Sequence, residues 1–139
     1  MSDAFLSRIF SLAQRTAVVV GGTGVLGGAL AEGLALAGAF VIVAGRDADR
    51  GLARLNAIRA AGGDGSFLAV DAVDRQSVHA LLDAATRTRG RVDILVNCAG
   101  VNSSAPYFDI ADDDWDKVLS TNLKSTHLGC QIFGQHMAG

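Results

Sequence analysis

The sequence predicts a doubly wound α/β domain, in which helices cover both faces of a parallel sheet. Half of the 139 residues are hydrophobic but only 6% are aromatic, so the core must be built from Ala, Val, Leu and Ile. This composition is typical of buried parallel strands packed by helices. Short apolar runs alternate with helical stretches at roughly even spacing, which implies right-handed crossovers and a parallel sheet. The length suits a single domain, which we expect to span residues 1–139.

Each predicted element has a recognisable end. The β-branched run at 18–20 stops at Gly21 and Gly22, and Gly38 closes the helix that follows. Asp47 is placed to cap the second helix. The expected strands are residues 18–20, 40–44, 67–70 and 92–96, and the expected helices between them are residues 25–37, 48–61 and a stretch that begins after Asp74.

The third helix is expected to be amphipathic, because its apolar residues recur at helical spacing on one face. They are Val78, Leu81, Leu82 and Ala85. A polar loop through Pro106 follows the fourth strand, and "DDDWDKVLSTNLKSTHLGCQIFGQHM" then reads as one or two helices. The topology of the doubly wound fold predicts the strand order 3-2-1-4.

That strand order places the fourth strand, residues 92–96, at an open edge of the sheet. An unpaired apolar edge recruits other chains. The last helix is expected to leave Leu123, Leu128 and Ile132 partly exposed, because the predicted elements leave it short of a neighbour. We therefore expect the chain to associate into homo-oligomers.

Charge and cysteine content argue against several classes of protein. Twelve basic and fourteen acidic residues are interspersed and give a net charge of −2, so nucleic acid is not an expected partner. Cys98 and Cys130 fit no metal-ligand spacing and no disulfide framework, which favours a reducing, cytoplasmic location. The aspartates at 112–114 are expected to start a helix rather than to bind a metal. The N-terminal segment has no continuous apolar stretch, so no membrane span is expected, and packing of its apolar residues on the edge of the domain is favoured over the alternative of membrane contact.

A cluster of five glycines follows the first strand within eight positions. Residues 22–27 fit G-x-G-x-x-G between a predicted strand and a predicted helix, which is the Rossmann-like arrangement for a dinucleotide. The glycines allow a tight turn and let backbone approach a pyrophosphate, which the start of the helix attracts. The alternative is a turn that only packs the helix close to the strand. The expected phosphate-binding residues are Gly21, Gly22, Thr23, Gly24, Leu26 and Gly27.

The end of the second strand bears on which dinucleotide is bound. NAD-binding domains usually place an acidic side chain there to bond the ribose 2′-OH. Here Gly45 and Arg46 occupy that end, and the nearest acid is Asp47. An arginine suits a 2′-phosphate, so NADP(H) is favoured and NAD(H) stays possible. The alternative is a solvated surface arginine beside an aspartate that only caps the next helix.

Through these motifs and those that follow along the chain, the sequence resembles the short-chain dehydrogenase/reductase family over nearly its whole length. The family's commonest glycine turn reads T-G-x-x-x-G-x-G. Here Val20 replaces the threonine and the middle glycine falls one position early, at Gly24, so the match is to a variant subset. "VDAVD" resembles the family's L-D-V-T-D, and "NCAG" resembles its N-N-A-G, with Cys98 in place of the usual Asn.

The resemblance implies roles for the residues of these two motifs. Asp71 would bond the adenine amino group and the Ala72 backbone would touch the ring, although a strand-end carboxylate in a turn is the plainer interpretation. Asn97 would steady the fourth strand, while Ala99 and Gly100 would lie along the nicotinamide ribose. Cys98 has no neighbour in the sequence that would make its thiol reactive, so a small buried residue is expected there.

The fourth matching motif is "TNLKSTHLGCQ", in which Asn122 falls on the family's helix asparagine. The resemblance implies that Asn122 takes part in catalysis by ordering a water in a proton relay; the alternative is a polar residue at an interface. The family's general acid or base is a tyrosine in Y-x-x-x-K. Tyr107, which precedes Asn122, is followed four positions later by Ala111 and cannot play that part.

The resemblance therefore implies an oxidoreductase that transfers hydride between NAD(P)(H) and an alcohol or carbonyl substrate. The chain would be its cofactor-binding portion, incomplete after the helix that carries Asn122 and without turnover of its own. A sugar-derived substrate is favoured by the resemblance of "GGTGVLGG" and "NSSAPYFDI" to carbohydrate-acting members. The alternative is a dinucleotide-binding or assembly module without catalysis.

Overall fold

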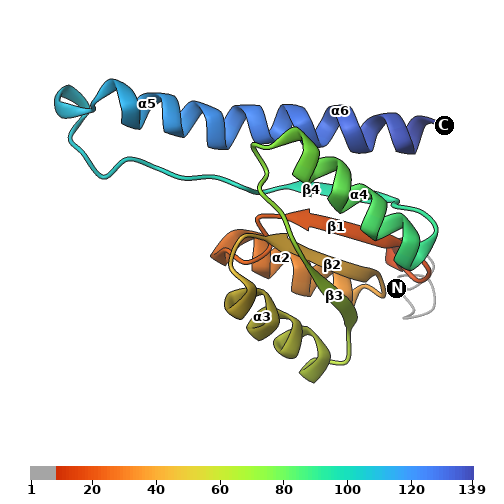
Figure 1. The fold of residues 1–139 in the computed structure, drawn as a ribbon. Helices are drawn as coiled ribbons and strands as arrows, with labels where there is room; N and C mark the ends of the chain where they lie inside the picture. The colour runs from red at the N-terminus through yellow and green to blue at the C-terminus, as the bar shows by residue number, and fades with distance from the viewer. Residues whose placement is uncertain (1–8) are drawn as a thin grey trace.

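The computed structural model describes residues 9–139, in which one parallel sheet forms the centre of the molecule (Figure 1). The strands are β1 (Thr16–Val20), β2 (Phe40–Gly45), β3 (Asp64–Ala69) and β4 (Ile94–Asn97). Their order is β3-β2-β1-β4, and all three neighbouring pairs are parallel. The predicted strand order and the doubly wound α/β class are confirmed.

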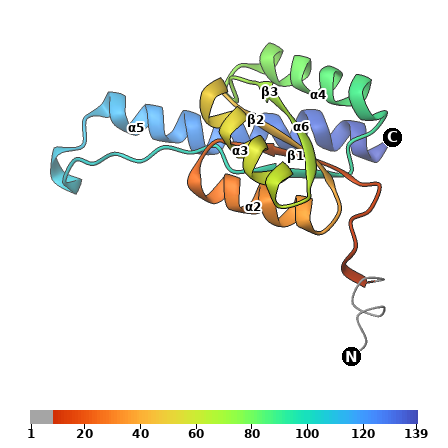
Figure 2. The same cartoon turned by 90° about the horizontal axis from the view of Figure 1, so that it is seen from below.

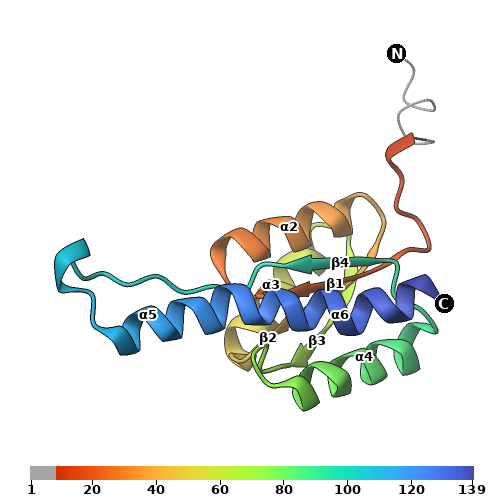
Figure 3. The ribbon, with the colours of Figure 1, turned by 90° about the horizontal axis from the view of Figure 1, so that it is seen from above.

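Helices cover both faces of this sheet. They are α2 (Val25–Leu36), α3 (Ala48–Ala60), α4 (Arg75–Arg89), α5 (Asp112–Leu119) and α6 (Ser125–Ala138). Figures 1 and 3 show α2 and α3 on one side of the sheet, with α4 and α6 on the other. A π-helical segment, Ser120–Lys124, joins α5 to α6, so that the three form one long rod (Figure 2). No helix within residues 9–139 is long and apolar enough to cross a membrane.

Alternation along the central strands divides the core between the two faces. Val18 and Val20 of β1 point toward α4 and α6, whereas Ala17 and Val19 point toward α2 and α3. All four side chains are buried, as expected for a strand covered on both sides. On the α6 side the largest of the fully buried side chains is Phe133.

The helix ends follow the predicted signals. The Asp47 carboxylate accepts a hydrogen bond from the Arg50 N–H at 2.9 Å and so caps α3. Asp74 caps α4 in the same way, by accepting from the Gln76 N–H. Gly38, just beyond α2, has φ of +100°, a left-handed conformation that favours glycine.

The structure corrects several boundaries and one packing expectation. β3 begins at Asp64, three residues before the predicted 67, and β4 begins at Ile94, two residues after the predicted 92. Leu128 and Ile132 are buried, because α6 packs against α4 and β4. The expectation that both would be partly exposed was therefore wrong, whereas Leu123 is exposed as predicted.

A cluster of charges fixes the end of β1 opposite the glycine turn. The Asp93 carboxylate accepts hydrogen bonds from the Thr16 N–H and from Arg15 Nη1, both at 2.9 Å, and pairs with Arg91 at 2.5 Å. Burial raises the pKa of Asp93, but the Thr16 and Arg15 hydrogen bonds and the two arginine charges outweigh it, so that the pKa is lowered overall. Asp93 thus ties β1 to the segment that enters β4.

Candidate functional site

The turn between β1 and α2 brings bare backbone to the carboxyl edge of the sheet. Gly21 has φ of +86°, and a Cβ there would lie 2.5 Å from the backbone N of Ala99. Only glycine is tolerated at such a position, because the left-handed conformation and the close approach both exclude a side chain. The glycine turn and the segment after β4 are therefore packed against one another.

The other motif glycines bring α2 close to the turn. A Cβ at Gly22 would lie 2.9 Å from the Val19 carbonyl oxygen, and a Cβ at Gly27 would overlap the backbone of Gly21. Gly24 precedes the first residue of α2, and no side chain caps the helix there. The first-turn N–H groups of α2 therefore have no side-chain acceptor within the described residues, which leaves them able to bind an anion.

A cavity of about 330 Å³ opens between this turn and the ends of the other strands. It lies where ligands bind in doubly wound sheets, at the carboxyl ends of the strands on either side of β1. Of the residues predicted to bind a cofactor, those that line it are Gly21, Thr23, Gly24, Arg46, Asp71, Ala72, Ala99 and Gly100. Those predicted site residues that do not line it are Gly22, Leu26, Gly27, Asn97 and Asn122.

Asn97 lies behind the cavity, at the end of β4. Its Nδ2 donates to Cys130 Sγ at 3.4 Å, whereas its Oδ1 is buried without a hydrogen-bond partner. A Cβ at Gly129 of α6 would overlap that oxygen. Asn97 therefore contacts α6 through a position that only glycine leaves open, an arrangement that accords with a role in steadying β4.

Asn122 joins the long rod to the segment that follows β4. Its Oδ1 accepts from the Val101 N–H at 2.8 Å, and its Nδ2 donates to the Val101 carbonyl oxygen at 3.0 Å. Gly100 lets the amide approach, because a Cβ there would lie 3.3 Å from Oδ1. Asn122 belongs to the π-helical segment, and its neighbour Thr121 lines the cavity. π-Helical turns occur frequently at functional sites.

The charged residues near the end of β2 differ in what they contact. The Asp47 carboxylate caps α3, so it is already engaged. The Arg46 side chain is exposed, lines the cavity and forms no ion pair within residues 9–139. This arrangement places a guanidinium without an ion pair in that range directly after β2, and the nearest carboxylate, Asp47, accepts the capping hydrogen bond of α3.

The structure also bears on the predictions for Asp71 and Cys98, which lie in the "VDAVD" and "NCAG" motifs. Asp71 lies in a turn in which its Oδ1 accepts from the Val73 N–H at 3.1 Å, and it also lines the cavity. Both interpretations of Asp71 therefore remain compatible with its position. Cys98 is only half-buried and lines the cavity, so the expectation of a buried small residue was wrong.

Sequence analysis missed several residues that line the cavity. They are Val20, Gly45, Arg50, Val70, Val73, Cys98, Val101 and Thr121. The most consequential is Arg50, in the first turn of α3. The predicted cap at Asp47 already placed this turn at the carboxyl edge of the sheet, so the signal was present in the sequence.

Two further expectations concern groups outside the cavity. No cluster of His, Cys, Asp or Glu within the described residues could hold a metal ion. α5 begins at Asp112, as predicted for the run of aspartates. Tyr107 lies in the short 3-10 helix Tyr107–Asp109, is 79% exposed and does not line the cavity.

Comparison with known proteins agrees with this geometry. The sequence profile of the short-chain dehydrogenase family matches residues 15–139. The short-chain reductase protein NovJ of Streptomyces niveus is 38% identical over 124 residues, which cover 89% of this chain and 47% of that protein. The D-threitol dehydrogenase of Mycolicibacterium smegmatis is 36% identical over 92% of this chain and 49% of its own length.

A solved reductase structure is also similar to this chain. The 3-oxoacyl (acyl-carrier-protein) reductase from Agrobacterium tumefaciens C58, with NADP bound, matches with a TM-score of 0.84 and 36% identity, over 95% of this chain and 51% of that chain. The chain spans about half the length of these relatives. From the glycine turn, the strand order and the profile match over residues 15–139, we conclude that the chain belongs to the short-chain dehydrogenase family.

Proposed function

We propose that this protein binds NAD(P)(H) and belongs to an oxidoreductase that interconverts an alcohol and a carbonyl. The observation that carries the proposal is the glycine turn, whose bare backbone and uncapped helix start border the cavity at the carboxyl edge of the sheet. Residues 1–139 would act as one cofactor-binding unit. The phosphates would lie over residues 21–27, with Thr23 and Leu26 at the turn, because that segment offers N–H donors and a positive helix end.

The remaining cavity residues would bind the two ends of the cofactor. We assign the adenine end to Asp71 and Ala72, and the nicotinamide end to Ala99 and Gly100, while Asn97 supports β4 from behind. The bound nicotinamide would accept or donate a hydride. Asn122 would position the segment at Val101 through its paired hydrogen bonds. In that place it would also order a water of the proton relay.

Within residues 9–139, no tyrosine of a Y-x-x-x-K motif lines the cavity as a proton donor. The reaction needs a group that protonates the carbonyl oxygen or deprotonates the alcohol. Tyr107 is exposed outside the cavity, and Ala111 stands where Y-x-x-x-K has its lysine. We therefore propose that the 139-residue chain binds the cofactor without turnover, and that the Ser, Tyr and Lys of the reaction are supplied from outside these residues.

NADP(H) is the proposed cofactor in preference to NAD(H). Arg46 supplies an unpaired guanidinium after β2, whereas Asp47 is engaged in capping α3. A bidentate guanidinium suits a phosphate, while an NAD site would need a free carboxylate for the ribose hydroxyls. The relative from Agrobacterium tumefaciens has NADP bound, which supports the same choice.

The substrate is proposed to be a small alcohol or carbonyl compound, with a sugar-derived polyol or ketone favoured. The support is the similarity to a D-threitol dehydrogenase, together with the glycine and "NSSAPYFDI" segments. A cytoplasmic location is proposed on the ground that both cysteines are free thiols. Homo-oligomers are proposed because β4 is an edge strand and because Phe108 and Trp115 are exposed.

Calorimetric titration of the folded chain with NADPH and NADH tests the proposal. We expect both to bind, NADPH more tightly, and no absorbance change at the nicotinamide band with a panel of alcohols and carbonyls. Absence of heat for either cofactor would refute cofactor binding. Light scattering coupled to size-exclusion chromatography tests association, for which a clean monomer is the contrary result.

A further inference from the structure

We infer that Arg50 is a second specificity-determining residue, which together with Arg46 forms a two-guanidinium clamp for a phosphate on the adenosine ribose. The inference rests on the proposed cofactor site and adds to it a residue that the motifs do not mark. Both side chains are exposed, and both line the same cavity. They reach it from different elements, Arg46 from the loop after β2 and Arg50 from the first turn of α3.

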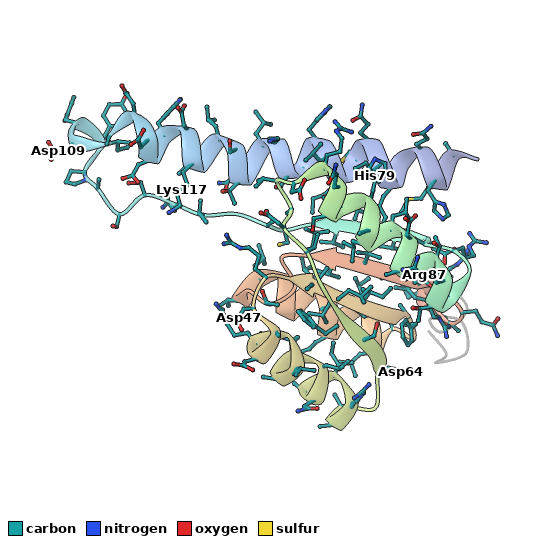
Figure 4. All side chains as sticks on the ribbon, viewed as in Figure 1. Asp47, Asp64, His79, Arg87, Asp109 and Lys117 are labelled. Atoms are coloured by element: carbon teal, nitrogen blue, oxygen red, sulfur yellow. The ribbon has the colours of Figure 1, made fainter. Side chains whose placement is uncertain are left out.

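The cap of α3 fixes where Arg50 begins. The Arg50 N–H donates to the Asp47 carboxylate at 2.9 Å, so the backbone of this first turn is fixed relative to the end of β2. A residue in the first turn lies beside the end of the helix that faces the carboxyl edge. Figure 4 shows Asp47 at that edge, with Asp64 and Arg87 at the opposite end of the sheet.

Thr23 and Arg50 together separate the main cavity from a smaller neighbouring hollow. Both residues line both spaces, and Ala53, Arg54 and Ala57 complete the smaller one. Gly45 makes this wall possible, because a Cβ there would lie 2.7 Å from Thr23 Oγ1. The Thr23 side chain therefore lies against the end of β2, and the phosphate-binding turn and the Arg50 turn meet at one wall.

The charged side chains that line the main cavity are Arg46, Arg50 and Asp71, so basic groups outnumber the acidic group there. Arg54 is neutralised by an ion pair with Glu32 of α2. Within residues 9–139, neither Arg46 nor Arg50 has an ion-pair partner. The Asp47 carboxylate is directed at the N–H of Arg50, and Asp49 does not line the cavity.

Two unpaired guanidiniums and the Asp71 carboxylate leave the cavity lining with an excess of positive charge, which favours an anion. Their planar donors match phosphate oxygens bidentately, which an ammonium or a hydroxyl cannot do. A single arginine after β2 would distinguish the two cofactors in part, whereas a pair reaching from two elements can hold the phosphate from two sides. The clamp therefore predicts that the loss of either arginine weakens binding of the 2′-phosphate specifically.

The test uses two probes that differ only in this phosphate, 2′,5′-ADP and 5′-AMP. Calorimetry on the 139-residue chain would compare wild type with Arg50→Ala, Arg46→Ala and the double variant. Arg50→Ala should weaken 2′,5′-ADP by about tenfold or more, the effect of one lost charge-assisted hydrogen bond, and should change 5′-AMP by less than about twofold. Far-UV circular dichroism should be unchanged, because the Arg50 side chain is exposed.

Arg87→Ala is the matched control. Arg87 is an exposed arginine of α4 at the far end of the sheet, so its loss makes the same change in net charge without touching the cavity. Both probes should bind this variant as they bind wild type. If Arg87→Ala weakens 2′,5′-ADP as much as Arg50→Ala does, the effect is one of net charge and the clamp is wrong.

The remaining outcomes separate the clamp from the cofactor site itself. Equal losses for both probes in Arg50→Ala would overturn the clamp and leave the cofactor site standing. Wild-type protein that binds 5′-AMP as tightly as 2′,5′-ADP would do the same. Wild-type protein that binds neither probe, nor NADPH, would overturn the proposed function and the clamp together.

Discussion

The two central strands and the α5 end of the long rod differ in how far their apolar side chains are buried. Every side chain of β1 is buried, and β2 is buried from its second residue onward. Around α5, by contrast, the large apolar side chains face outward, and Phe108 is 95% exposed. Figures 2 and 3 show this end of the rod extending beyond the sheet. Apolar residues at helical spacing thus indicate a face that can pack, but only neighbouring elements decide whether it does.

Substitution of one buried and one exposed phenylalanine tests this difference in burial most directly. Phe133 of α6 is fully buried against the sheet, so Phe133→Ala should lower the free energy of unfolding by about 3–5 kcal/mol. Phe108→Ala removes the same atoms from an exposed site and should change it by less than about 0.5 kcal/mol. Urea denaturation of both variants supplies the measurement. Similar losses in the two would mean that the α5 end is packed in solution.

A pair of glycines sharpens the comparison at the level of the backbone. Gly21 and Gly90 both have positive φ, but a Cβ at Gly21 would lie 2.5 Å from Ala99 N whereas one at Gly90 meets open space. Gly90→Ala should cost about 1–2 kcal/mol for the left-handed conformation alone. Gly21→Ala should cost about 1–3 kcal/mol more from overlap, and should also abolish dinucleotide binding. Denaturation and calorimetry on both variants test this, and equal costs would show that the turn can relax.

The parts of the fold that sequence analysis predicted depend on local chemistry. The Asp47 and Asp74 caps, the left-handed Gly38 and the glycine turn are each set by a few neighbouring residues. Strand order followed from the alternation of strands with helices, since right-handed crossovers leave few topologies. The same local signals placed eight of the predicted site residues around one cavity.

The features that were missed depend on contacts between distant segments. Leu128 and Ile132 are buried because α6 packs against α4 and β4, which helical spacing alone does not reveal. The pairing of Asn122 with Val101 joins residues 21 positions apart, so no local pattern marks it. Arg50 is the exception, because the Asp47 cap already placed the first turn of α3 at the carboxyl edge of the sheet. No tyrosine–lysine pair of the Y-x-x-x-K kind lines the cavity within the described residues.

The Asp93 cluster, at the end of the sheet opposite the cavity, gives a pH-dependent test. The pKa of Asp93 is lowered below its ordinary value of 3.8, so its stabilising contribution is complete above that value and is lost as the pH falls through the lowered pKa. Asp93→Asn should therefore lower the free energy of unfolding by about 1–2 kcal/mol near neutral pH. The gap between variant and wild type should narrow as the pH falls below 3.8 and through the lowered pKa of Asp93. A gap that does not change with pH would assign the effect to shape rather than charge.

The smallest expected effect lies where the buried sheet meets the exposed surface of α4. The Arg89 guanidinium carbon lies 4.4 Å from the centre of the Phe40 ring, a cation–π contact at the start of β2. Arg89→Met keeps the length of the side chain and removes the charge, so it should lower the free energy of unfolding by about 0.5–1 kcal/mol. Arg87→Met is the matched control, because Arg87 and Arg89 both lie in the last turn of α4 and share the favourable interaction with the helix dipole. The difference between the two variants in urea denaturation isolates the contact with the ring. If both variants lose the same amount, the dipole accounts for the whole effect, and Phe40 is held by burial against its neighbours alone.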